Sequence, residues 1–496
     1  MSKSHRINLD VKKQSRLQQA YNLPDSQIEH SAEGLLSTQL DPLREFLASL
    51  PPWDSVGALR ACILLFIVTD GEMDPRQMQL EAVIPLAAGH NSLVDVGTGS
   101  RKTLCMVLAV LLDLGGVSLV ISPLKWLQIN QVREFQRYAI RVMNTGHYSV
   151  IIVAPESLDS TCGNNPRIGQ LIRDNKEPFK RKIQQVLVDE GHFVHTAGTD
   201  LYGLKAYRPA YGHLGSLRVW LATGMPIQVL SGTLPPHIKH SVVNSLGLRP
   251  NFTSIGMSSN SPNLIYATHP IIGSLNDFHN LDFLIPPPKL NDVVFFDNIS
   301  KASDAVTYLE SHTNLPENDW NKGIFREYHG DMTPGFLDEV FKSFTSTHGT
   351  VKVLCATSGV ATGIDSANIA WAVQYGTFVD VSSGRQRGGR AGRNPDVPGL
   401  FMTLYEPWAA ETDVSSMANI PSDPDAPLQR IDSHSKRREC IASATSHIGL
   451  GSFHGFDAWL ASCEVLLSCP IKEVLVKLGN FPRARRDCPK VPLGLP

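Results

Sequence analysis

The segment between a short apolar strand and an apolar helix contains residue types suited to binding phosphate. Gly97-Thr98-Gly99-Ser100-Arg101-Lys102-Thr103 follows the predicted strand 92–96 and precedes the predicted helix 104–112. A glycine-containing loop at a helix N-terminus presents backbone N–H groups to an anion. In such a loop Lys102 would reach the β and γ phosphates of a nucleotide, and the Thr103 hydroxyl would bind Mg²⁺. The alternative is an ordinary glycine-rich turn.

Arg101 departs from this pattern, because the residue before the lysine is normally glycine. Glycine lets the backbone approach phosphate without a Cβ in the way. An arginine could strain the loop, block the nucleotide, or point outward without harm, and the sequence leaves these three outcomes open.

A second apolar strand, 186–189, ends in Asp189-Glu190-Gly191-His192. In a triphosphate hydrolase Asp189 would hold Mg²⁺ and Glu190 would orient the attacking water. Two acids after a strand can also begin a helix. Their place after the phosphate loop and before Ser231-Gly232-Thr233 favours hydrolysis, with Ser231 and Thr233 coupling it to nucleic acid.

Two arginines three residues apart lie in the sequence Gln386-Arg-Gly-Gly-Arg390-Ala-Gly-Arg393. Arg390 and Arg393 would stabilise the charge that develops on a triphosphate bound by the first half of the chain. The alternative is a basic loop that contacts nucleic-acid phosphates or solvent.

Short, nearly continuous apolar runs alternate with helix-like stretches, which predicts an α/β fold with buried parallel strands. The first series of predicted strands is 92–96, 117–122, 150–153, 186–189, 220–223 and 228–231, and the second is 293–296, 323–328, 351–356, 370–375 and 399–404. The stretch between them is rich in Asn, Ser and Pro and predicts a linker. We therefore expect an N-terminal arm (1–52), a first lobe (53–250), a linker (251–270), a second lobe (271–408) and a C-terminal region (409–496).

The composition is that of a globular chain, with 496 residues, 42% hydrophobic and 19% charged. The net charge of -2 and the pI of about 6.8 mean that any phosphate-binding surface must be local. The eight cysteines are scattered and no secretory signal is evident, which predicts reduced thiols. The most apolar run, 61–69, is too short to span a bilayer, so no membrane partner is expected.

An ordered set of motifs resembles that of the RecQ-like superfamily 2 helicases, with most likeness to divergent fungal members, and covers roughly residues 55 to 408. The motifs are Arg76-x-x-Gln79, Thr98 to Cys105, Ile121-Ser-Pro-Leu124 with Gln131-Val132, Ala154-Pro-Glu156, Asp189 to His192, Arg208-Pro-x-Tyr211-x-x-Leu214, Ser231-Gly-Thr233, Pro262-Asn263-Leu264, Tyr328-His329-Gly330, Gly363-Ile-Asp365 and Gln386 to Arg393.

The resemblance implies two tandem RecA-like lobes, each a parallel sheet with flanking helices, and a small C-terminal region. It implies ATP and Mg²⁺ as cofactors, and 3′-to-5′ unwinding of DNA driven by ATP hydrolysis. Single-stranded and duplex DNA would be the partners. We further expect a monomer that acts in DNA repair and recombination in the nucleus, with the cytoplasm as the alternative location.

The resemblance also assigns site residues. Arg76 and Gln79 match the adenine-recognising motif, and residues 193–211 stand where the family has an aromatic-rich loop that senses single-stranded DNA. The family's tryptophan is missing there, and Gly191 stands where alanine is usual. The nucleotide-binding set is Arg76, Gln79, Gly97 to Thr103, Gly363, Asp365 and Gln386; the metal-binding set is Thr103 and Asp189; the catalytic set is Lys102, Asp189, Glu190, Arg390 and Arg393; and the coupling set is His192, Tyr207, Arg208, Ser231 and Thr233. Tyr202 and Tyr211 join Tyr207 as candidates for base stacking.

Cys440, Cys463, Cys469 and Cys488 faintly resemble the zinc module that follows many RecQ motors, but their spacing lacks a C-x-x-C pair, so no zinc is expected. Two alternatives to an active DNA helicase remain. One is a degenerate paralogue with little or no ATPase because of Arg101, and the other is a superfamily 2 RNA helicase.

Overall fold

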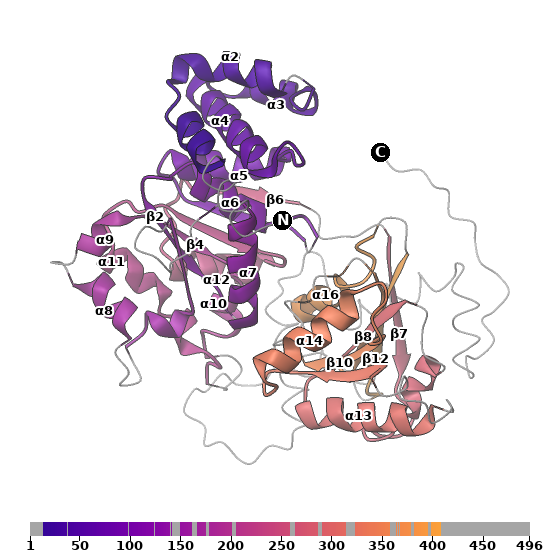
Figure 1. Cartoon of the computed structure of the whole chain (residues 1–496). Helices are drawn as coiled ribbons and strands as arrows, with labels where there is room; N and C mark the ends of the chain where they lie inside the picture. The colour runs from indigo at the N-terminus through magenta and orange to yellow at the C-terminus, as the bar shows by residue number, and fades with distance from the viewer. Residues whose placement is uncertain are drawn as a thin grey trace, which may run out of the picture. The chain divides into compact units, whose positions relative to one another are not determined.

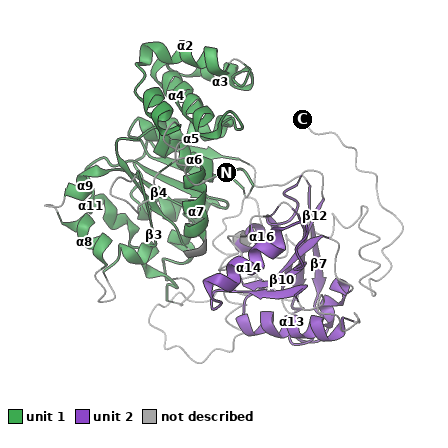
Figure 2. Cartoon of the chain, in the orientation of Figure 1, with its two compact units in different colours: residues 1–259 green, residues 260–496 purple. Residues whose placement is uncertain are grey.

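The computed structural model describes residues 13–407, except 37, 98, 124, 139, 141–148, 161–165, 175–177, 201–204, 258–262, 286–289, 314–322, 358–363, 365, 367, 378–380 and 395–397. The chain divides into two compact units, residues 1–259 and 260–496 (Figure 2). Each unit is an α/β lobe with its own sheet. The predicted fold class of two tandem parallel-sheet lobes is confirmed.

Unit 1 contains a six-stranded sheet in the order β3-β2-β4-β5-β1-β6. Strands β2, β4 and β6 of this sheet are labelled in Figure 1. All its neighbouring strands pair in parallel, so their carboxyl ends share one edge of the sheet. The inner strands are almost wholly buried, as their apolar runs predicted. The strands are β1 (Ser92–Asp95), β2 (Val117–Ile121), β3 (Val150–Val153), β4 (Ile183–Val188), β5 (Ile227–Ser231) and β6 (Thr253–Gly256).

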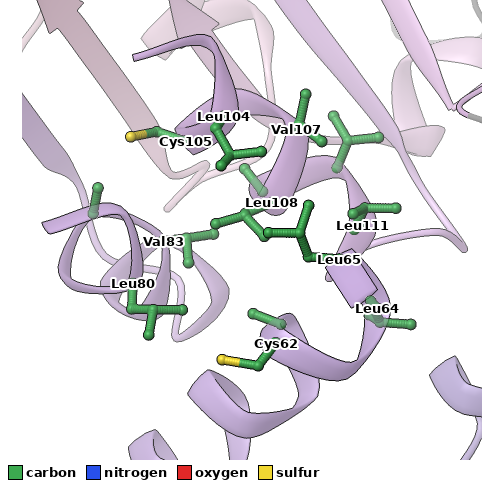
Figure 3. Close-up of a cluster of buried hydrophobic side chains, with 14 of the residues drawn as sticks. Cys62, Leu64, Leu65, Leu80, Val83, Leu104, Cys105, Val107, Leu108 and Leu111 are labelled. Atoms are coloured by element: carbon green, nitrogen blue, oxygen red, sulfur yellow. The ribbon is translucent and has the colours of Figure 1, made fainter. Parts of the chain in front are cut away.

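Three helices form the apolar layer beside this sheet: α4 (Pro52–Thr69), α5 (Gln77–Ala87) and α6 (Thr103–Leu111). Their side chains interdigitate in one cluster, in which Leu65 of α4 and Val83 of α5 lie near Leu108 of α6 (Figure 3). Eight of the nine residues of α6 are buried, so this helix is fixed firmly in the core and its first residue is held in place. The other helices are α2 (Asp25–Leu36), η1 (Asp41–Leu43), α3 (Arg44–Ser49), α7 (Lys125–Arg137), η2 (Pro155–Ser157), α8 (Arg167–Arg173), α9 (Pro178–Lys182), α10 (Phe193–Thr196), η3 (Pro209–Tyr211), η4 (Leu214–Ser216), α11 (Leu217–Trp220) and α12 (Pro236–Ser245).

The segment expected as an N-terminal arm is folded onto unit 1 where the structure describes it. The Arg60 guanidinium, on α4, donates to the backbone oxygens of Ala20, Tyr21 and Leu23. Helix α4 begins at Pro52 and is long and apolar enough to cross a membrane by length and composition, unlike the shorter run 61–69 considered above. Half of it is buried inside unit 1, where it serves as a core helix.

Unit 2 contains a second six-stranded parallel sheet, in the order β7-β12-β11-β8-β10-β9. The helices α13 (Ile299–His312) and α14 (Pro334–Thr345) supply apolar faces to its core, and α16 (Val381–Gly388) precedes the last strand. A short helix, η5 (Phe278–Leu284), packs beside α13. The strands are β7 (Leu264–Pro270), β8 (Asn291–Phe296), β9 (Phe325–Tyr328), β10 (Val353–Thr357), β11 (Ile369–Tyr375) and β12 (Gly399–Tyr405).

Two expectations about local structure are wrong. Residues 220–223 were expected as a strand, but Trp220 ends helix α11 and a turn follows. An apolar run of four residues is too short for its periodicity to separate strand from helix. Within the expected linker 251–270, β6 pairs with β1 and β7 pairs with β12. Both are edge strands, which need only one neighbour and fewer apolar residues than inner strands.

Candidate active site

The glycine-containing loop lies between β1 and α6, at the carboxyl edge of the sheet. Gly99 adopts a left-handed backbone with φ +86, and the Ser100 hydroxyl donates to the Gly97 oxygen at 2.7 Å. No side chain caps the N-terminus of α6. This arrangement directs the first turn of a buried helix toward the loop, where an anion would be stabilised. Thr98 lies outside the described residues.

Lys102 is folded back over this loop. Its Nζ donates to the backbone oxygens of Val96 at 3.0 Å and Gly97 at 3.4 Å. These carbonyls hold the ammonium group at the end of β1. A phosphate oxygen can replace them as the partner, because each bond is a single contact to a neutral acceptor.

Arg101 occupies the glycine position with a left-handed backbone, φ 59, and an exposed side chain. Its carbonyl accepts a hydrogen bond from Gln79 Nε2 at 3.3 Å. Of the three outcomes left open above, the side chain points outward and the strain is in the backbone. A left-handed conformation destabilises an L-residue by about 1–2 kcal/mol.

Gln79 ties helix α5 to the loop. It is fully buried, and its Oε1 accepts from the Arg76 backbone N–H at 2.8 Å while its Nε2 donates to Arg101. The Arg76 side chain is exposed and borders a cavity of about 400 Å³. The cavity is lined by Thr38, Gln39, Pro42, Leu43, Asp74, Pro75, Arg76 and Gln77. The adenine-motif residues therefore connect a cavity beside α5 to the phosphate loop.

Asp189 follows β4 and is buried beneath this loop. Its Oδ2 accepts from Gln131 Nε2 at 2.6 Å, and its Oδ1 accepts from the Glu190 N–H at 3.0 Å. Burial and the neighbouring Glu190 carboxylate raise the pKa of Asp189, whereas the positive charge of Lys102 opposes the rise. This electrostatic interaction means that the acidic pair and the loop lysine lie in one place.

The donors present fit Mg²⁺. Among the described residues no group of three or more His, Cys, Asp or Glu could hold a metal ion. Mg²⁺ needs no such cage, because it is usually held by one or two protein oxygens together with substrate phosphates and water. The Asp189 carboxylate and the Thr103 hydroxyl, at the first residue of α6, supply oxygens of that kind.

Glu190 also has a left-handed backbone, φ 49. Its Oε2 is buried without a hydrogen-bond partner and lies 3.4 Å from His192 Nδ1. Asp70, Arg101 and Glu190 are the non-glycine residues with positive φ in the described part of the chain, and two of them lie at this site. Backbone strain of this kind gathers at functional sites, where the surrounding structure maintains it.

A hydrogen-bonded link joins the acidic turn to the Ser-x-Thr segment. His192 is buried, and its Nδ1 lies 3.0 Å from the Ser231 Oγ at the end of β5. The Thr233 N–H in turn donates to Ser231 Oγ at 3.3 Å. A change at Glu190 can therefore be transmitted through two buried side chains to the segment after β5.

Two residues of this site had no role assigned from sequence. Gln131 appeared only as part of a motif, and the structure makes it the partner of Asp189. Asp95, at the end of β1, accepts from the Leu234 N–H at 3.2 Å, and burial raises its pKa. An acidic residue at the carboxyl end of an apolar strand was the only signal for Asp95.

The expected DNA-sensing segment is organised by Arg208. Its guanidinium donates to both Glu156 oxygens at 2.7 Å and to the Pro123 carbonyl, and it stacks on the Tyr211 ring at 5.1 Å. Tyr211 is buried, whereas the neighbouring Tyr207 is 86% exposed. Arg208 is therefore a structural clamp, and Tyr207 is the exposed aromatic side chain among the described residues of this segment. Tyr202 lies outside the described residues.

In unit 2 the arginine motif begins within α16 and continues into the following turn. Gln386 and Arg390 are buried, and Arg390 Nη1 donates to the Ile364 oxygen at 3.2 Å. Arg393 Nε donates to the Gly389 oxygen at 3.1 Å. The motif is thus held rigidly against its own unit. Gly363 and Asp365 lie outside the described residues, as do Cys440, Cys463, Cys469 and Cys488.

Arg387 was not assigned a role from sequence, although it lies within the motif. It is buried and pairs with the Asp297 carboxylate at 2.9 Å. This ion pair fastens α16 to the end of β8.

Two family profiles match the chain, one in each unit. The DEAD/DEAH box helicase profile matches residues 76–239, and the helicase conserved C-terminal domain matches residues 289–395. In solved structures the fold is similar to that of Mycobacterium smegmatis helicase Lhr bound to ssDNA and AMP-PNP, with a TM-score of 0.53, 19% identity, and coverage of 82% of this chain and 57% of that one. The fold is also similar to that of the DUF1998 helicase MrfA bound to DNA, with a TM-score of 0.54 and 16% identity. The match covers 69% of this chain and 51% of the MrfA chain.

Curated relatives include RecQ helicases. The chain is 25% identical over 352 residues to ATP-dependent DNA helicase RecQ of Pasteurella multocida, which covers 67% of this chain and 50% of the relative. It is 25% identical over 349 residues to ATP-dependent DNA helicase hus2/rqh1 of Schizosaccharomyces pombe. That alignment covers 64% of this chain and 24% of the relative. The expected closeness to fungal members is not supported, because the bacterial relative is equally identical. The chain spans about half the length of the bacterial relative. It matches the profiles of two helicase domains, one in each unit, and is similar to the RecQ helicases.

Proposed function

We propose that this chain is an ATP-dependent DNA helicase that couples ATP hydrolysis to 3′-to-5′ movement on one strand. The observation that carries the proposal is the interaction of Lys102 with Asp189 beside Glu190, joined through His192 to Ser231. These groups supply phosphate binding, metal binding, water activation and a route to the nucleic-acid-binding segments. The names of the RecQ relatives support DNA as the substrate.

In this mechanism the loop N–H groups, the first turn of α6 and Lys102 bind the triphosphate. Thr103 and Asp189 would hold Mg²⁺, which would supply positive charge to the bound triphosphate. Glu190 orients the attacking water, and its buried unbonded oxygen is poised to accept a hydrogen bond from that water. A role of Arg390 and Arg393 as arginine fingers stays a prediction, since their hydrogen bonds to Ile364 and Gly389 lie within unit 2.

The cavity beside Arg76 is proposed to receive the nucleotide base. It combines apolar Pro42, Leu43 and Pro75 with polar Thr38, Gln39 and Asp74, as base-binding pockets do. Gln79 spans from this region to Arg101 and would transmit base binding to the loop.

Tyr207 is proposed to stack on a base of the single strand, because it is exposed beside the rigid Arg208 clamp. Stacking of one base on an aromatic ring contributes about 1–3 kcal/mol. The direction of movement and a nuclear location stay predictions.

The test is ATP hydrolysis by the natural chain with and without single-stranded DNA, beside Glu190→Gln and Tyr207→Ala. We expect DNA to raise the rate in the natural chain, Glu190→Gln to abolish turnover, and Tyr207→Ala to raise the DNA concentration needed for half-stimulation about tenfold. Absence of ATP hydrolysis in the natural chain under every DNA condition would contradict the proposal. If RNA stimulates ATP hydrolysis and DNA does not, the substrate is RNA and not DNA.

A further inference from the structure

The acidic turn lies close to β5 at Gly191. The Gly191 N–H donates to the Leu230 oxygen at 2.8 Å. A Cβ added to Gly191 would lie 2.2 Å from Val229 Cγ1, closer than real Cβ atoms come to any neighbour. The turn and the strand can therefore hold this spacing only while residue 191 lacks a side chain.

Glycine is needed here for space and not for backbone conformation. Gly191 has no left-handed φ, whereas the neighbouring Glu190 does. An alanine at this position would meet no conformational barrier. The steric conflict with Val229 is thus the sole reason the structure gives for glycine.

Val229 cannot yield easily. It is fully buried on β5, where it pairs with Val188 on one side and Leu93 on the other. A β-branched side chain has few accessible rotamers, and a well-packed interior resists added volume. A methyl group at residue 191 would therefore displace the turn itself.

This displacement would act on the coupling link. An ordinary contact needs at least 3.4 Å, so the turn would withdraw by about 1 Å from β5. His192 and Ser231 lie on the two sides of this gap, and their 3.0 Å separation would exceed hydrogen-bonding distance. Glu190, which precedes Gly191, would move with the turn.

We infer that Gly191 and Val229 form a size-matched pair that sets the spacing between the acidic turn and the Ser-x-Thr segment, and so positions Glu190 and His192. Both are positioning residues. The inference rests on the proposed function for its catalytic consequence, but the pairing itself is a property of the fold.

The experiment compares Gly191→Ala, Val229→Ala and the double variant with the natural chain, in both melting temperature and ATP hydrolysis with and without single-stranded DNA. Gly191→Ala should lower the Tm by several degrees and reduce the DNA-stimulated to basal rate ratio about tenfold or more, since a displacement of about 1 Å can slow a reaction about 100-fold. Val229→Ala should lower the Tm through the cavity it leaves and keep the stimulation. The double variant should recover most of the ratio and melt above Gly191→Ala.

Gly34→Ala on α2 is the matched control, because a Cβ there has nothing within 4 Å, and its Tm should not fall. Additive changes in Tm in the double variant, or a Gly191→Ala chain with natural Tm and stimulation, would overturn the pairing. If Gly191→Ala does not fold, recovery of a cooperatively melting chain in the double variant supports the pairing, and failure of both overturns it. If the natural chain hydrolyses no ATP, the proposed function fails while the Tm cycle still decides the pairing.

Discussion

Each unit has a helix that directly follows an inner strand of its parallel sheet, and the two helices begin differently. In unit 1, α6 follows β1 through the glycine-containing loop and has no side-chain cap. In unit 2, α13 follows β8 and is capped by Asn298, whose Oδ1 accepts from the Ser300 N–H at 2.8 Å. The Asn298 cap satisfies one first-turn donor of α13, whereas the first-turn donors of α6 have no such side-chain cap and are available to an anion at the loop. The same strand-helix unit thus begins with a side-chain cap in one lobe and, in the other, with the loop proposed to bind phosphate.

Buried carboxyl groups show the same contrast. Asp189 lies at the carboxyl end of β4, with the positive charge of Lys102 and hydrogen bonds from Gln131 and Glu190. Asp292 lies near the amino end of β8, and burial raises its pKa to about 8 against one opposing hydrogen bond, from the Trp371 N–H. The first carboxyl group has partners suited to a metal-binding role. The Asp292 carboxyl group is also buried, but within the described part of the chain it lacks a neighbouring lysine charge and a side-chain amide donor of the kind that Asp189 has.

Lys102→Ala tests the comparison of the two helices and is expected to have a large effect. Removing the ammonium group leaves the phosphates without their main cationic partner, so ATP turnover should fall about 100-fold or more while the fold persists. An ATP hydrolysis assay measures the loss of turnover, and circular dichroism measures whether the fold persists. The unit 2 control is Lys301→Ala, at the start of the capped helix α13, which should leave turnover within about twofold. Equal loss in both variants would remove the functional distinction between the two helices.

The second prediction concerns how the stability of unit 2 depends on pH. Because the pKa of Asp292 is raised to about 8 in the fold, the folded chain keeps a proton that the unfolded chain has lost above its ordinary pKa near 3.8. Stability of unit 2 should therefore fall as pH rises from about 4 to 8, by up to about 1.4 kcal/mol per pH unit, and level off above 8. Asp292→Asn should flatten this slope in denaturant unfolding across that range.

Asp189→Asn sharpens the contrast between the two carboxyl groups. It should abolish ATP turnover and also flatten a slope of the same sign in unit 1, because burial and Glu190 raise the pKa of Asp189. Asp292→Asn should leave turnover unchanged. A loss of turnover on changing Asp292 would show that the contrast is mistaken.

The difference in helix capping predicts a change in the stability of unit 2. Asn298→Ala should destabilise unit 2 by about 1 kcal/mol, because the Ser300 N–H loses its acceptor, while Asn298→Asp should keep the cap. Denaturant unfolding measures both variants. An unchanged stability in Asn298→Ala would mean that the cap contributes nothing.

Sequence reasoning succeeded where a pattern has one physical explanation. The inner strands were predicted because parallel strands covered on both faces are continuously apolar, as in β2 and β8. Edge strand β6 was missed because two of its four residues are exposed, which resembles a loop. The four-residue segment 220–223, which has three apolar residues, was assigned to a strand because it is too short to show a helical period.

At the site, the loop and the acidic pair were located by residue type, but their partners were not. The bonds from Gln131 to Asp189 and from Gln79 to Arg101 join residues 58 and 22 positions apart in the chain. Such contacts depend on how strands are ordered, and no local pattern specifies them. The clash that excludes a side chain at Gly191 is likewise visible only when β4 and β5 are neighbours.

The smallest expected effect on stability, and the most informative one about the loop, comes from Arg101→Gly. Arg101 holds a left-handed backbone that glycine adopts without strain, so the change removes about 1 kcal/mol of strain. The greater freedom of glycine in the unfolded chain offsets part of that gain, and the net change in unfolding free energy should be below about 1 kcal/mol.

The effect of Arg101→Gly on turnover should be larger, because removing the Cβ lets the N–H groups of the loop close on the phosphates. DNA-stimulated ATP hydrolysis should therefore rise relative to the natural chain. Arg101→Ala separates the causes, since it removes the guanidinium and keeps the Cβ. A gain in Arg101→Gly alone assigns the limitation to the backbone, and an equal gain in Arg101→Ala assigns it to the side chain. If the natural chain already matches both variants, the loop is fully competent with arginine in the glycine position.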